Sequence, residues 1–192
     1  MNVPTPDVGD FEAVARVIAS RRTSMLVDTE RDVDDDVLDD LFRLAAWAPC
    51  HKRTWPWRFC KVRGDSRGRL GSVVATAMER SGDPTPKVDK ARTKYLRTPV
   101  VLVIGSVVGD TPNRTVENRD ATAAAVQNLM LAASARGLAT YWGSCPTGAS
   151  DDVARFAGFD DGTSIVGLFY LGWATSSPEA PERPAPIVTR RD

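Results

Sequence analysis

Histidine and cysteine are scarce in this chain, which has one histidine, His51, and three cysteines among its 192 residues. A Ser-His-Asp triad would have to use His51, and a cysteine-protease-like site would have to pair it with Cys60 or Cys145. Cys50 is its neighbour in sequence, a poor geometry for a dyad in an extended segment. An odd cysteine count without a C-x-x-C pair fits neither a disulfide framework nor a zinc site. We therefore expect no metal site and no catalytic side chain of the hydrolase type.

Net charge and long apolar runs are lacking as well. The chain has 25 basic and 25 acidic residues, which argues against nucleic acid or an anionic membrane as the main partner and weakly favours association with other protein surfaces. Its N-terminus has no basic region followed by an apolar one, and the apolar run over residues 99–108 is too short to span a bilayer. Together with the sparse cysteines, these features predict a cytoplasmic protein.

Both common phosphate-binding loops are missing, since the chain has neither G-x-x-x-x-G-K-[ST] nor G-x-G-x-x-G. A nucleotide cofactor would have to be held by other groups, and guanidinium groups match phosphate bidentately. Two basic clusters follow predicted helices: Arg21-Arg22, beside the hydroxyl groups of Thr23 and Ser24, and residues 51–53 (HKR). Cations also complement the C-terminal end of a helix. Taken alone, each cluster fits a solvated helix end as well as a cofactor contact.

Apolar periodicity predicts the secondary structure. Helices are expected over residues 10–20, 69–80, 87–97, 120–136 and 150–157, and a further helix lies within residues 28–48, where an apolar stripe runs from Val37 to Ala48. Strands are expected over 57–62, 99–107, 138–143 and 164–172. The segment 109–119 (GDTPNRTVENR) is predicted to be a loop, and the proline-rich tail from residue 173 an extended arm that lies on another surface. No repeat or linker divides the chain, so we expect one α+β domain over residues 1–192.

Five segments of the chain carry a family resemblance. They are SRRTS (20–24), AAWAPCHKRTWPWRF (45–59), KARTKYLRTPVVLVI (90–104), AAAVQNLMLAASARGLATYWGS (123–144) and IVGLFYLGWA (165–174). In this order and spacing, they resemble the motifs of the nitroreductase family of flavoproteins, especially its short bacterial NAD(P)H nitroreductases. The resemblance extends over nearly the whole chain. It departs from the family at Trp55, where the family has glutamine, and at Trp47, where the short members often have arginine.

The resemblance implies a nitroreductase-like α/β sandwich, in which helices flank a central, mostly antiparallel sheet, with an extended C-terminal arm. It also implies a homodimer with FMN at the subunit interface. Each implied FMN contact lies in one of the five segments. Arg21, Arg22 and Thr23 would hold the phosphate and the pyrimidine side, Trp142, Gly143 and Ser144 would line the flavin, and Trp47 and His51 would come from the partner subunit. Arg22 and Lys52 are alternative cations for the reduced ring.

The implied activity is that of an FMN-dependent NAD(P)H oxidoreductase. NADH or NADPH would deliver hydride to flavin N5, and a small-molecule acceptor such as a nitroaromatic or a quinone would then take the electrons in a ping-pong mechanism. The altered tryptophan positions keep two alternatives open. One is a specialised flavoenzyme of the same fold, such as a dehydrogenase, a dehalogenase or a flavin-cleaving enzyme. The other is a flavin-binding or storage protein without efficient turnover.

Overall fold

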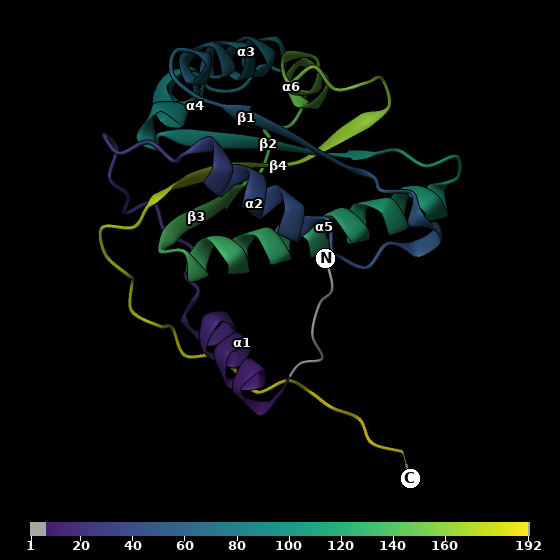
Figure 1. Ribbon diagram of the computed structural model, residues 1–192. Coiled ribbons are helices and arrows are strands. Elements are labelled where there is room, and N and C mark those ends of the chain that lie inside the picture. The colour runs from purple at the N-terminus through teal and green to yellow at the C-terminus, as the bar shows by residue number, and fades with distance from the viewer. Residues whose placement is uncertain (1–6, 192) are drawn as a thin grey trace.

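A computed structural model describes residues 7–191 of the chain (Figure 1). Residues 1–6 and 192, which belong to the expected single domain, lie outside the described range. Residues 1–6 are also about half of the N-terminal stretch that has no basic region followed by an apolar one. The helices are α1 (Val8–Ser20), α2 (Asp35–Ala45), η1 (His51–Arg53), α3 (Ser66–Arg80), α4 (Thr85–Thr93), η2 (Lys94–Arg97), α5 (Pro112–Ala135) and α6 (Ser150–Phe156). None of the helices between residues 7 and 191 has the length and apolar character that a membrane span requires.

The strands form one antiparallel sheet in the order β1-β2-β4-β3, with β1 (Trp57–Val62) and β3 (Leu138–Gly143) at its two edges. The central strands are β2 (Val100–Val107) and β4 (Thr163–Trp173). Almost every residue of β2 is buried, because helices cover both faces of the sheet, and this explains its continuous apolar sequence. The α+β class and the antiparallel sheet flanked by helices are thus confirmed.

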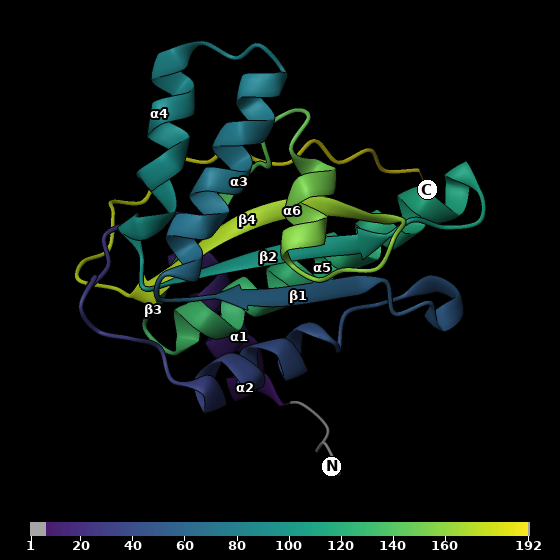
Figure 2. The same ribbon diagram turned by 90° about the horizontal axis from the view of Figure 1, so that it is seen from above.

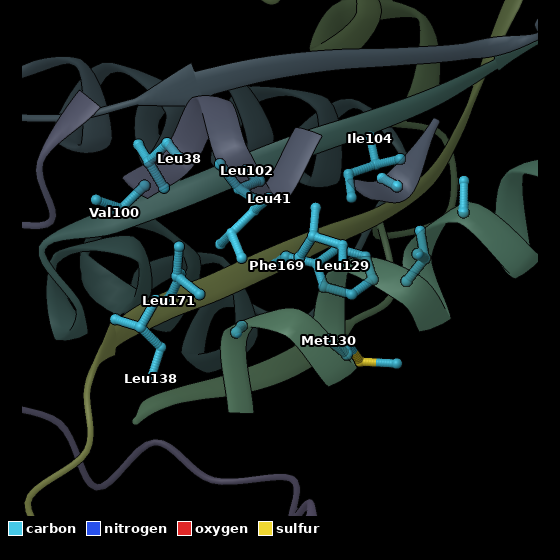
Figure 3. Packing of buried hydrophobic residues seen from close by; sticks show 14 of the residues in the cluster. Leu38, Leu41, Val100, Leu102, Ile104, Leu129, Met130, Leu138, Phe169 and Leu171 are labelled. Atoms are coloured by element: carbon cyan, nitrogen blue, oxygen red, sulfur yellow. The ribbon is translucent and has the colours of Figure 1, made fainter. Parts of the chain in front are cut away.

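Two helical layers enclose the sheet (Figures 1 and 2). On one face, α2 and α5 pack against alternate residues of β2 and β4, and Figure 3 shows Leu41, Leu129 and Phe169 meeting in this core. On the other face, α3, α4 and α6 cover Val101, Val103 and the remaining alternate positions. The alternation of side chains between the two faces of each strand therefore builds two separate cores.

The helix α5 begins at Pro112, so the prediction of a loop over residues 109–119 was wrong. The Thr111 hydroxyl accepts a hydrogen bond from the Arg114 backbone amide at 3.1 Å, and Pro112 takes the first helical position. Both features begin helices. The first turns are polar because they project beyond the core. Apolar periodicity therefore did not predict that they are helical.

The helix α1 buries none of its residues. Its predicted apolar face includes Phe11, Val14 and Ile18, and the Phe11 side chain is 74% exposed. The helix contacts the rest of the chain mainly through a shallow apolar groove shared with the C-terminal part of α5. From Thr175 to Arg191 the chain forms neither helix nor strand, as expected for an arm.

Candidate functional site

A cavity of about 670 Å³ lies along the edge strand β3. Most of its walls come from the segment Thr23–Leu26, the end of β3, and the helices α4 and η2, and single residues of α3, β4 and the arm complete them. Its lining residues are Thr23, Ser24, Met25, Leu26, Met78, Lys87, Lys90, Ala91, Lys94, Arg97, Tyr141, Gly143, Ser144, Tyr170 and Pro178. Cavities of this volume commonly bind small molecules.

The segment Thr23–Leu26 is held against the sheet by its backbone. Thr23 forms a parallel bridge with Thr140 of β3, and the Ser24 amide donates to the Thr140 carbonyl at 3.0 Å. Further along, the Thr175 amide donates to the Leu26 carbonyl at 3.0 Å. The segment thus covers part of the β3 edge and fixes the position of the residues directly before it.

Those preceding residues are Arg21 and Arg22, at the C-terminal end of α1. One Arg22 nitrogen, Nη1, donates to the carbonyls of Ala19 and Arg21 at 2.7 and 2.9 Å. Within residues 7–191, however, the buried Arg21 Nη1 and Arg22 Nε have no hydrogen-bond partner. Burial, followed by repulsion from Arg183 and Arg22, lowers the pKa of the Arg21 guanidinium. Because unpaired buried donors are unfavourable, this cluster fits an anion such as a phosphate.

The C-terminal arm therefore brings Arg183 close to Arg21. A basic residue of the arm could also contact the phosphate, and Arg190 and Arg191 are the candidates near its end. Within the described chain, it is Arg183 whose charge acts on Arg21. The arm also supplies Pro178 to the cavity wall.

At the end of β3, successive side chains alternate between the two faces of the sheet. Tyr141 and Gly143 line the cavity, followed by Ser144. The Trp142 side chain points to the opposite face, where its ring lies 5.0 Å from that of Phe169 and its Nε1 donates to the Val166 carbonyl at 3.3 Å. Of the three residues predicted here, Gly143 and Ser144 line the cavity with Thr23, while Trp142 contributes only its backbone to this part of the strand.

Trp47 and His51 lie away from this cavity, in the connection that precedes β1. The strands β1 and β3 are the opposite edges of the sheet, so they lie three strand spacings, or about 14 Å, apart. Trp47 is 68% exposed and His51 is also exposed. The structure therefore does not bring these two residues together with Arg21, Arg22 and Thr23 in one subunit. Lys52, an alternative cation for the flavin, lies in the same distant connection.

The connection has a strained backbone. Lys52, Arg53 and Trp55 have φ angles of 59°, 54° and 46°, in a region that non-glycine residues seldom adopt. A buried amide anchors it: the Thr54 hydroxyl donates to Asn118 Oδ1 at 2.7 Å, and Asn118 Nδ2 donates to the Val107 carbonyl at 2.9 Å. Strained residues cluster at functional sites, which makes this loop a candidate contact surface.

Nucleophilic chemistry finds little support in the geometry. Burial raises the pKa of the Cys145 thiol to about 11 and also raises that of Cys60, so both thiols are protonated at neutral pH and unreactive. His51 precedes the opposite edge strand from Cys145. Among residues 7–191, no group of three or more metal-ligating side chains comes together.

Sequence reasoning missed the cations of α4 and η2. Lys87, Lys90, Lys94 and Arg97 all line the cavity. Their spacing of three, four and three residues places them on one side of a helix, and this pattern was visible in the sequence.

The fold and the cavity together define a class of protein: an antiparallel α+β sandwich with a cluster of arginines and a cavity whose lining contains neither cysteine nor histidine. Comparisons with known proteins identify the family. Residues 18–173 match the Nitroreductase family, and the chain belongs to this family of flavin oxidoreductases.

Individual relatives agree with this assignment. The chain is 29% identical over 186 residues to "Putative NAD(P)H nitroreductase YdjA" of Escherichia coli (strain K12), covering 93% of this chain and 99% of YdjA. The crystal structure of a nitroreductase-like family protein from Bacillus cereus matches with a TM-score of 0.77 and 27% identity, covering 96% of this chain and 94% of the other. The FMN-dependent nitroreductase NfnB of Mycobacterium smegmatis, solved in complex with NADPH, matches in fold with a TM-score of 0.74 at 20% identity, covering 94% and 100% of the two chains.

Proposed function

We propose that this oxidoreductase binds FMN, takes hydride from NADH or NADPH, and passes the electrons to a nitroaromatic, a quinone or a similar small acceptor. The observation that carries the proposal is the pair of buried, unpartnered guanidinium nitrogens on Arg21 and Arg22, directly before the cavity-lining Thr23 in the chain. The related YdjA and NfnB, which are described as NAD(P)H- and FMN-dependent nitroreductases, support it.

The residues present fit FMN. Its phosphate carries about two negative charges, which Arg21, Arg22 and Arg183 would balance. Its ring would lie in the cavity, between Thr23 on one side and Gly143 and Ser144 on the other. We thus retain Arg21, Arg22, Thr23, Gly143 and Ser144 as cofactor-binding residues, with Trp142 bracing the strand from its opposite face.

When bound, FMN supplies the N5 position that accepts hydride and returns it to an acceptor. The chain's own residues would bind, orient and shield. Lys90 and Lys94 place positive charge on the cavity wall, where it stabilises the negative charge of a reduced ring better than the distant Lys52 within the same subunit could. Tyr141 and Tyr170 add aromatic walls, with their ring centroids 5.7 Å apart in an edge-to-face arrangement. No general base is needed, which agrees with the protonated cysteines.

We further propose a homodimer with FMN at each subunit interface. The apolar face of α1 is uncovered in a single chain, and exposed apolar surfaces of this kind mark contacts between proteins. Trp47 and His51 would then reach the FMN of the partner subunit from the connection before β1. Their exposure and their distance from their own cavity support this assignment.

The first test is whether the purified protein carries FMN. It should be yellow, and denaturation should release FMN. Anaerobic addition of NADH or NADPH should then bleach the flavin absorbance. A protein that binds no FMN would overturn the proposal, whereas a yellow protein that neither nucleotide bleaches would be a storage protein or an enzyme that uses another reductant.

The second test concerns the dimer. Sedimentation should give twice the 20.9 kDa mass of one chain. A stable monomer that still binds FMN with full affinity would contradict the interface assignment.

A further inference from the structure

One wall of the cavity carries a line of four cations. Lys87 and Lys90 belong to α4, and Lys94 and Arg97 belong to η2, which continues it. Because they follow one another at intervals of three, four and three residues, they face the same side. All four side chains therefore face the cavity.

The helix itself does not explain this line. Cations near the C-terminal end of a helix are favoured by its dipole, which accounts for Lys90 and Lys94. Lys87, however, lies in the first turn of α4, where the dipole disfavours a cation and where no acidic residue offsets it. Like charges three and four positions apart also repel each other along a helix. The arrangement slightly weakens the isolated helix, and neither the dipole nor pairing within the helix accounts for Lys87.

No carboxylate balances the four charges. None of the salt bridges among residues 7–191 includes Lys87, Lys90, Lys94 or Arg97, and no Asp or Glu lines the cavity. On another side of α4, by contrast, Arg92 pairs with Glu79. Burial lowers the pKa of Lys94, and the charge of Lys90 acts in the same direction. In a chain of zero net charge, this wall is a local excess of positive charge.

The proposed cofactor does not use up this excess. Its phosphate has its own cluster in Arg21, Arg22 and Arg183, none of which lines the cavity. The oxidised ring is neutral, and the reduced ring gains at most one negative charge. At least two of the four cations on the wall therefore remain without an anion.

We propose that this wall selects an anionic electron acceptor, of the chemical class of small aromatic carboxylates. The inference rests on the proposed flavin function. The cations would hold the carboxylate, and Tyr141, Tyr170 and Met78 would contact the aromatic ring from the neighbouring walls. For a nitrobenzoate the first reduction balances as ArNO2 + NADH + H+ → ArNO + NAD+ + H2O, so NADH is oxidised by two electrons and one nitro oxygen leaves as water.

Equilibrium binding tests the wall without turnover. Benzoate and its neutral analogue benzamide are titrated calorimetrically into the oxidised, FMN-loaded protein. We expect benzoate to bind at least about tenfold more tightly, the scale of one charged hydrogen bond, and to lose this advantage at high salt. The double variant Lys87→Gln/Lys90→Gln should lose most of the difference. The matched control is Arg69→Gln, which removes a charge from an exposed position on α3 that does not line the cavity.

Kinetics supply the second readout. The ratio of kcat/KM for 4-nitrobenzoate to that for 4-nitrobenzamide should be well above one and should fall about tenfold in the double variant. Equal binding of benzoate and benzamide in a protein that NADH still bleaches would refute the anion wall and leave the proposed function intact. Failure of bleaching by either nucleotide would refute the proposed function itself.

Two further outcomes assign the cations elsewhere and also overturn the inference. If the double variant releases FMN while the acceptor ratio is unchanged, the lysines hold the cofactor. If it raises KM for NADPH but not for NADH or 4-nitrobenzoate, they bind the nucleotide phosphate.

Discussion

The two edges of the sheet differ in how they present functional groups. At the β3 edge, the segment Thr23–Leu26 pairs with the strand, and four cations line one wall of a cavity. At the β1 edge, the preceding connection turns outward, exposes Trp47 and His51, and has a strained backbone. In the proposed function, the first edge receives the ligand and the second contacts the partner subunit. The proposed homodimer would bring the two edges of different chains together.

The second edge depends on a single buried side chain. Each residue at positive φ in residues 52–55 costs about 1–2 kcal/mol, so the loop needs support from the rest of the fold. Asn118 provides it by linking Thr54 to the Val107 carbonyl. The two edges therefore predict different consequences of substitution: loss of ligand at β3 and loss of loop structure at β1.

The largest effect is expected from Arg21→Ala at the β3 edge. Removing a charged contact to the FMN phosphate should weaken FMN binding by about 1.5–3 kcal/mol, or roughly 10- to 150-fold. Arg21 is preferable to Arg22, because Arg22 also bonds carbonyls of α1. Fluorescence titration of apoprotein with FMN measures the change, with Arg69→Ala as the control. Unchanged affinity would remove Arg21 from the phosphate site.

The next effect should arise at the β1 edge, from Asn118→Ala. Loss of the amide leaves the Thr54 hydroxyl and the Val107 carbonyl without this partner, and we expect the free energy of unfolding to fall by about 2 kcal/mol. Urea denaturation measures it. The control Asn113→Ala lies on the same helix, where Asn113 bonds Glu117 at the surface, and should change stability little. If both variants behave alike, Asn118 does not clamp the loop.

A smaller effect is expected on the pH dependence of stability, which should again differ between the two edges. Near the cavity, burial raises the pKa of Cys145 to about 11 from its ordinary 9.0. Since the folded state favours the protonated thiol, its contribution to stability is complete below pH 9 and is lost as pH rises toward 11. Cys145→Ala should therefore flatten stability between pH 9 and 11, measured by urea unfolding. Cys50→Ala, beside the strained loop, is the control, and an equal flattening there would argue against the assignment.

The smallest effect should come from the backbone at Lys52. Glycine tolerates positive φ, so Lys52→Gly should leave stability unchanged or raise it by up to about 1 kcal/mol. Lys52→Val, whose branched side chain resists this conformation, should lower it by about 1–2 kcal/mol. The difference between the two urea midpoints tests the strain directly. Equal midpoints would mean that the loop does not hold this conformation in solution.

Much of the fold was accessible from the sequence because local pattern and burial agree. β1 and β3 begin and end where alternation predicted, and the continuous apolar run of residues 99–107 became the buried β2. The start of α5 was missed because its first turns are polar and depend on Thr111 and Pro112 rather than on an apolar face. The candidate site was partly predictable from the sequence, because Arg21, Thr23 and Gly143 lie in motifs with a recognisable order.

The sequence by itself determined which residues are available: arginines without a phosphate loop, one histidine, and an α+β alternation of elements. Tertiary structure decided how they meet. The pairing of Thr23 with Thr140 places Thr23 at the cavity, strand alternation turns Trp142 away from it, and the strand order separates His51 from it. The arm brings Arg183 to Arg21, and α4 aims its lysines inward. The Thr23–Thr140 pairing, the strand order and the approach of Arg183 to Arg21 join residues far apart in the chain, so no local pattern predicts them.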